Sequence, residues 1–146
     1  MKKICLIIPP SPFLLDERVF PFLGILKVAS SFEQQGAKCD VLDLSGISNP
    51  EEVVIDHFKN NQEYEFIGLT ATTPQMPNAF KLAQIIKQSC PNIKLVLGGS
   101  HVTLIHTASK LEQKKNIVGR STFGIEKIKS VFDVVVAGDG ELTLDT

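Results

Sequence analysis

The run Ile4-Cys5-Leu6-Ile7-Ile8, followed at once by Pro9-Pro10-Ser11-Pro12, decides the class of fold. Consecutive apolar residues without polar alternation are typical of a strand that is buried on both faces, as the strands of a parallel sheet are. Lysines precede the run, as they do in a signal peptide, but the run is too short for the core of one and prolines follow it. We therefore predict a buried strand at 4–8 and a loop that begins at Pro9.

Helix-like and strand-like segments alternate outward from this run. Apolar spacing predicts a helix over 22–35 that Gly36 ends. Pro50, followed by two glutamates, predicts the start of a second helix that runs to about residue 60. Further helices are predicted at 76–89 and 101–114, and strands at 38–44, 66–70, 94–97 and 131–137. The stretch 116–130 has no clean period, so we predict a connector there, with room for a short helix near 125–129.

Strands joined by helical crossovers indicate an α/β domain, with a five-stranded parallel sheet and helices on both faces. The crossovers are expected to be right-handed, and the predicted strand order is 2-1-3-4-5, which is flavodoxin-like and Rossmann-like. A length of 146 residues suits one domain over 1–146. Only 142–146 follow Glu141, where a covering helix is normal, so we expect a fragment of a longer chain because an open sheet face exposes apolar surface.

Composition and charge exclude several classes of function. The net charge of −1 argues against a nucleic-acid partner, which usually meets a basic stripe. The nearest approach to such a stripe, Lys110, Lys114 and Lys115, is interspersed with Glu112, as in a solvated helix end. No stretch approaches the roughly 20 apolar residues of a membrane helix, so no membrane partner is expected.

Cysteine usage points to a reducing cytoplasm. The three cysteines, Cys5, Cys39 and Cys90, are odd in number and none forms a C-x-x-C pair. This pattern favours neither a disulfide framework nor a zinc site. Cys5 and Cys39 lie in apolar runs and are expected to act as small buried hydrophobes.

The candidate site lies beyond the carboxyl ends of the strands, where ligands bind in open α/β sheets. For the order 2-1-3-4-5 the strand order reverses between the first and third strands, so the relevant segments are 9–22, 70–77, 98–103 and 138–143. No G-x-G-x-x-G or G-x-x-x-x-G-K-[ST] motif is present, which argues against dinucleotide and P-loop sites. Thr70 stands where a phosphate-receiving signalling domain needs an aspartate.

Four short segments follow the strands in order: Pro9-Pro10-x-Pro12, Thr70-Ala71-Thr72-Thr73, Gly98-Gly99-Ser100-His101 and Gly138-Asp139-Gly140-Glu141. Together they resemble the N-terminal cobalamin (vitamin B12)-binding domain of the radical S-adenosylmethionine superfamily. The resemblance covers essentially the whole chain. It implies cobalamin as cofactor and a fused downstream barrel as partner. That barrel would bind S-adenosylmethionine and a [4Fe-4S] cluster through C-x-x-x-C-x-x-C, a motif this sequence lacks.

The resemblance implies methyl transfer or related radical chemistry in the full-length protein and no catalytic residue in this segment. The implied cofactor-binding residues are small or polar: Pro10, Ser11, Thr70, Ala71, Thr72, Thr73, Gly98, Gly99, His101, Gly138, Gly140 and Glu141. One feature departs from better-known cobalamin domains. They carry D-x-H-x-x-G after the first strand, with the histidine as lower ligand to cobalt, whereas residues 9–24 contain no histidine. The lower face of cobalt is then open, water-ligated or met by another side chain.

Several residues admit a structural role beside the ligand role. Gly98-Gly99 serves either as a turn or as a point of ligand approach. His101 is either a cap or hydrogen-bonded loop residue, or a ligand. Asp139 and Glu141 either begin a helix or bind a cofactor amide. His57, in an amphipathic helix, is expected at the surface.

Two other functions remain open for the whole domain. The first is an interaction domain of the same fold without cofactor, which shapes the entrance of a downstream barrel. The second is a stand-alone binder of a small nucleotide-like ligand.

Overall fold

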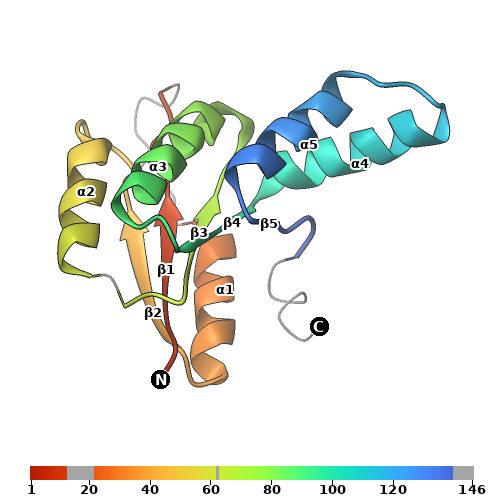
Figure 1. The fold of residues 1–146 in the computed structure, drawn as a ribbon. Coiled ribbons are helices and arrows are strands. Elements are labelled where there is room, and N and C mark those ends of the chain that lie inside the picture. Colours follow the sequence, from red (N-terminus) through yellow and green to blue (C-terminus); the bar gives the residue numbers. More distant parts are fainter. Residues whose placement is uncertain (13–21, 62, 140–146) are drawn as a thin grey trace.

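The computed structural model describes residues 1–12, 22–61 and 63–139 (Figure 1). Its strands are β1 (Lys3–Ile8), β2 (Lys38–Asp43), β3 (Phe66–Thr70), β4 (Lys94–Gly98) and β5 (Val134–Val135). Its helices are α1 (Leu23–Gln34), α2 (Pro50–Asn60), the short 3-10 helix η1 (Thr73–Gln75), α3 (Met76–Ser89), α4 (Ser100–Lys114) and α5 (Arg120–Val131). The predicted site residues Gly140 and Glu141 lie outside the described residues.

In the described part of the chain the strands form one five-stranded sheet in the order β2-β1-β3-β4-β5, with every neighbouring pair parallel. This confirms the predicted order. Strand β1 lies inside the sheet and pairs Ile7 with Leu42 on one side and with Leu69 on the other. Because side chains alternate along a strand, β1 supplies apolar residues to both faces, which is why its run has no polar interruption.

The larger core lies on the face covered by α2 and α3. Cys5 and Ile7 of β1 point into it together with Val54 and Phe58 of α2. Helix α3 adds Ala79, Leu82, Ala83 and Ile86, all at most 1% exposed. The helix spacing of these residues, near 3.6 per turn, made α2 and α3 predictable from the sequence.

The opposite face is covered by α1 alone among the described helices. Ile25 and Ala29 of α1 pack on Leu6 and Ile8 of β1. The alternation of side chains also places four small residues of β3 and β4 on this face, which we call the small-residue strip: Gly68, Thr70, Val96 and Gly98. Leu6 covers Gly68, while the other three are partly exposed.

Helix α5 corrects the sequence prediction for 116–130. A full helix, Arg120–Val131, stands where a connector was predicted. It buries only Ile125 and Ile128, so its apolar period is weak. It is held instead by α4: a Cβ at Gly124 would lie 3.3 Å from Cδ1 of Ile105, so the two helices pack closely there. Figure 1 shows α4 and α5 as a hairpin that projects from the sheet.

Strand β5 is shorter than predicted. The expected strand 131–137 pairs as a strand only at Val134–Val135. Val131 ends α5, and the amide of Phe132 still donates to the carbonyl of Ile128. The apolar run Val131-Phe132 therefore packs as a helix end, which apolarity alone does not distinguish from a strand.

The expectation that His57 lies at the surface is wrong. Its ring is half-buried, and its Nε2 lies 2.8 Å from the Tyr64 hydroxyl. That hydroxyl donates to Asp40 Oδ2 at 2.7 Å, so the histidine must donate to the tyrosine oxygen. The cluster ties α2 to β2 at the end of the sheet opposite the candidate site.

The thiols behave as expected of small hydrophobes. Burial raises the pKa of Cys5 to about 12 and that of Cys39 to about 11. Both are therefore unreactive thiols at neutral pH. Within the described residues no helix has the length and apolarity needed to cross a membrane.

Candidate functional site

The loops after β3 and β4 are joined by three hydrogen bonds at the carboxyl edge of the sheet. The Ala71 amide donates to the Gly98 carbonyl at 3.2 Å, and the His101 amide donates to the Ala71 carbonyl at 3.2 Å. The Thr73 hydroxyl lies 2.9 Å from Nδ1 of His101. The structure thus brings together two of the segments that the sequence predicted as neighbours.

The two glycines after β4 differ in role. Gly99 has φ of 104°, and a Cβ there would lie 2.7 Å from both N and O of Ala71. Glycine is therefore required at 99 for the approach of the two loops. Gly98 has no positive φ, and the atom nearest a Cβ would be the Val136 carbonyl oxygen at 3.8 Å. Gly98 has space beside it, so the ligand role stays open for Gly98.

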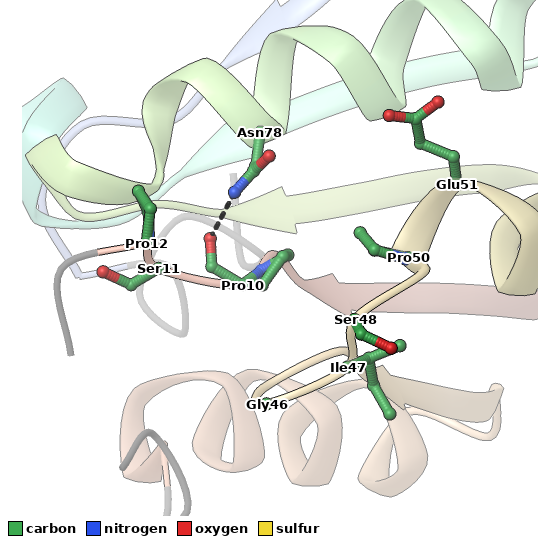
Figure 2. A pocket seen from close by; sticks show the side chains of 9 residues that line it. All are labelled: Pro10, Ser11, Pro12, Gly46, Ile47, Ser48, Pro50, Glu51 and Asn78. Atoms are coloured by element: carbon green, nitrogen blue, oxygen red, sulfur yellow. Dashed lines mark hydrogen bonds between the residues drawn. The ribbon is translucent and has the colours of Figure 1, made fainter. Parts of the chain in front are cut away.

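Gln75 and Asn78 hold the loop after β1, and the sequence analysis did not single them out. The buried Gln75 side chain donates to the Pro9 carbonyl at 2.8 Å, and Asn78 donates to the Pro10 carbonyl at 2.9 Å (Figure 2). Oε1 of Gln75 accepts the Thr72 amide at 2.9 Å. The pattern Thr-x-x-Gln, a capping box, was the available signal.

Thr103 ties the loop after β5 to the same edge. Its hydroxyl donates to the Gly99 carbonyl at 3.1 Å and accepts the Gly138 amide at 3.0 Å. This residue was also missed, because a threonine inside a helix gives no sequence signal for a contact 35 residues away. Through Thr103, Gln75 and Asn78, the four strand-end loops form one hydrogen-bonded rim.

The predicted site residues occupy three depths in this rim. Thr72, Thr73 and Gly138 are exposed. Thr70, Gly98, Gly99 and His101 are half-buried. Pro10, Ser11 and Ala71 are buried, so they form the floor beneath the exposed residues. Gly140 and Glu141 lie outside the described residues.

A cavity of about 310 Å³ lies beside the rim, between the loop after β1 and the loop after β2 (Figure 2). The loop after β2 also begins at the carboxyl edge of the sheet, yet it was not among the segments predicted from the sequence to form the site. The strand order reverses between β1 and β3, and ligands of open α/β sheets bind at such a reversal, so β2 was not part of the prediction. The lining residues are Pro10, Ser11, Pro12, Gly46, Ile47, Ser48, Pro50, Glu51 and Asn78.

The rim presents hydroxyls and a neutral imidazole. Burial holds the pKa of His101 below its ordinary value, which favours the uncharged ring at neutral pH. The Thr73 hydroxyl lies beside this ring, and Thr72 is exposed in the same loop. The described residues contain no group of three His, Cys, Asp or Glu side chains that could hold a metal ion. Such a surface suits a ligand that is rich in neutral amides and hydroxyls.

Comparisons with known proteins agree with this geometry. A family model described as the B12 binding domain matches residues 17–146. The uncharacterized methyltransferase PH0819 of Pyrococcus horikoshii is 29% identical over 97% of this chain, and the chain spans 28% of that protein.

Solved structures share the fold. The radical S-adenosylmethionine methyltransferase TsrM from Kitasatospora setae, with tryptophan substrate and a SAM analog bound, superposes with a TM-score of 0.62 at 14% identity. The superposition covers 73% of this chain and 21% of that one. A second TsrM structure, with cobalamin and a [4Fe-4S] cluster bound, has a TM-score of 0.60. The pilus assembly protein CpaE from Caulobacter crescentus has a TM-score of 0.53 at 15% identity, over 97% of this chain and 86% of CpaE. At these identities the likeness concerns the fold alone.

Proposed function

Because this chain belongs to the B12 binding domain family, we propose that it binds cobalamin at the carboxyl edge of its sheet. The observation that carries the proposal is the hydrogen-bonded rim, which holds four loops in one arrangement before any ligand arrives. Preorganised polar groups bind a ligand without the cost of ordering the loops first. The bound cofactor would supply a cobalt centre able to carry a methyl group.

We propose that the nucleotide tail of the cofactor would lie against the small-residue strip. Thr70, Val96 and Gly98 lie on the face of α1 and are partly exposed, and the strip leads up to the rim. Small side chains allow a flat ligand to approach the backbone closely. Thr72 and Thr73 would then offer hydroxyls to the amide groups of the ring.

The loop after β1 lacks the histidine that binds cobalt in better-known cobalamin domains. Residues 9–24 contain no histidine, so the D-x-H-x-x-G arrangement is absent from this sequence. Nδ1 of His101 lies 2.9 Å from the Thr73 hydroxyl. Nε2 is then the ring nitrogen that could bind another group. We propose that His101 would contact the bound cofactor as a rim residue, and we assign it no bond to cobalt.

We further propose that the domain serves a larger radical S-adenosylmethionine methyltransferase. The chain spans 28% of a methyltransferase relative and 21% of TsrM, so the relatives carry much more chain than this domain. Reading the parent gene beyond Thr146 tests this part. The sequence C-x-x-x-C-x-x-C is expected there, and its absence would contradict the radical-enzyme assignment.

Retention of hydroxocobalamin through desalting tests the binding itself. We expect visible corrin absorbance at one equivalent or less per chain. Gly98→Val should reduce retention, because the new methyl groups fill the space next to the strip without backbone strain. Gly24→Val, at a helix position with no atom within 4 Å of a Cβ, is the matched control and should leave retention unchanged.

Thr72→Trp probes the rim from the exposed side. Intact corrin binding by this variant would show that the loop after β3 makes no contact. No retention by either this domain or the full-length parent would overturn the cobalamin proposal and leave the cofactor-free interaction domain as the better description.

A further inference from the structure

The far end of the α4–α5 hairpin, residues 110–120, is a distinct surface that we call the hairpin tip. The hairpin is anchored at its base, where Val102 of α4 and Ile128 of α5 are at most 1% exposed. Lys127 lies over the ring of Phe80 on α3 at 5.0 Å, which adds a second anchor. Figure 1 shows the tip directed away from the sheet. The tip is thus a rigid projection and plays no part in the rim.

Apolar side chains are exposed at the tip without a structural role. The turn is made by Asn116, with φ of 52°, and by Gly119, where a Cβ would lie 2.5 Å from Oε1 of Glu112. Between them Ile117 is 54% exposed and Val118 is 69% exposed. Turns normally carry polar residues at such positions. The backbone conformation does not require this apolar pair, and the described core does not bury it.

The charge of the tip is strongly positive. Four cations, Lys110, Lys114, Lys115 and Arg120, stand against the single acid Glu112, which gives 4 − 1 = +3. Since the whole chain has a net charge of −1, the remainder has −4. None of the four cations forms an ion pair within the described residues.

The sequence pattern predicted a solvated helix end in which Glu112 is interspersed with lysines, but the Glu112 carboxylate is bound to the start of α5. This carboxylate accepts the amides of Gly119 at 3.2 Å, Ser121 at 3.2 Å and Thr122 at 2.9 Å. The Thr122 hydroxyl donates to it at 2.5 Å. The one acid of the tip therefore points toward the start of α5, and the cations precede and follow the exposed Ile117-Val118 pair in the sequence.

We propose that the hairpin tip docks on the surface of an anionic lipid bilayer, in contrast to the expectation of no membrane partner, which rested on the lack of a spanning segment alone. Cations near such a surface gain from its negative potential, and apolar side chains gain by entering the boundary of the acyl chains. A nucleic acid would satisfy the cations, but the exposed Ile117-Val118 pair would stay in water. This proposal is independent of cobalamin binding.

The chain has no tryptophan, so one introduced indole reports on its own position. Val118→Trp is titrated with vesicles of phosphatidylcholine alone and with vesicles of equal phosphatidylglycerol and phosphatidylcholine. We expect a blue shift of the emission with the anionic vesicles only. Leu23→Trp, on α1 at a site of similar exposure (65%), is the control and should not shift. An unshifted emission at position 118 would overturn the proposal.

Charge substitutions test the electrostatic part by vesicle flotation. Lys114→Gln/Lys115→Gln should weaken binding to anionic vesicles by roughly 25-fold, since each cation near the surface is worth roughly a factor of five. Lys27→Gln/Lys59→Gln removes two exposed lysines from α1 and α2 and should leave binding within about two-fold. An equal loss in both pairs would show that overall charge, and not the tip, governs binding.

The double variant Ile117→Ser/Val118→Ser tests the contribution of the apolar pair to vesicle binding. Circular dichroism checks that its helix content is unchanged. Vesicle binding should fall while binding to a soluble polyanion, such as polyglutamate or polyadenylate, stays the same. Wild-type binding to a soluble polyanion without binding to anionic vesicles would contradict the lipid proposal and identify an acidic macromolecule as the partner.

Discussion

Gly98 and Gly99 are adjacent, yet only one of them is required by the backbone. The sequence analysis left the pair open between a turn and a ligand contact, and the structure separates the two residues. Gly99 permits the close approach of Ala71, whereas Gly98 is part of the small-residue strip and has space beside it. The structure therefore requires glycine at position 99, while a ligand contact at Gly98 remains a proposal.

Gly99→Ala should destabilise the domain by about 2–3 kcal/mol, because it adds a Cβ at a left-handed φ and directly against Ala71. Urea unfolding followed by circular dichroism measures the change. Gly24→Ala, in an open helical site, is the control and should change stability by less than about 1 kcal/mol. Equal stability of Gly99→Ala and the wild type would mean that the two loops can separate at little cost.

Helix α5 was not predicted in full from the sequence, whereas other elements were. Strand 66–70 and helix 76–89 were predicted with the bounds of β3 and α3, because local apolar patterns determine them. Helix α5 depends on Gly124 meeting Ile105 and on the carboxylate of Glu112, which is 10 residues before Thr122. These partners in α4 cannot be read from the local sequence of α5.

Glu112→Ala should loosen the start of α5 without unfolding the sheet. The three amides that the carboxylate accepts would turn to water, so the amide protons of Ser121 and Thr122 should exchange several-fold faster. Hydrogen exchange followed by NMR measures this. Glu126→Ala removes an exposed acid from the same helix and should leave those two rates unchanged. Unchanged rates in Glu112→Ala would show that packing on α4 alone holds the helix.

At the scale of the whole molecule, the sheet order and the meeting of strand-end loops followed from the sequence through general rules of α/β topology. The details of the rim did not. Gln75 bonds to Pro9 across 66 residues and Thr103 to Gly138 across 35, and each depends on the finished fold. The buried positions of Pro10, Ser11 and Ala71 likewise appear only when the loops pack against one another.

Two histidines at opposite ends of the sheet link the stability of the molecule to pH in the same direction. Burial lowers the pKa of both His57 and His101, so each binds a proton more tightly in the unfolded chain than in the folded one. Their contribution to stability is therefore complete above the unfolded value, about 6.5, and is lost as pH falls through the folded values.

We thus expect the thermal unfolding midpoint to decrease as the pH is lowered from about 7.5 to about 5, the range in which histidines and few other groups titrate. His57→Gln/His101→Gln should flatten this dependence, since an amide can still donate to Tyr64 but does not titrate. A slope that survives in the double variant would assign the pH dependence to other groups, and a midpoint that rises on acidification would reverse the sign of the linkage.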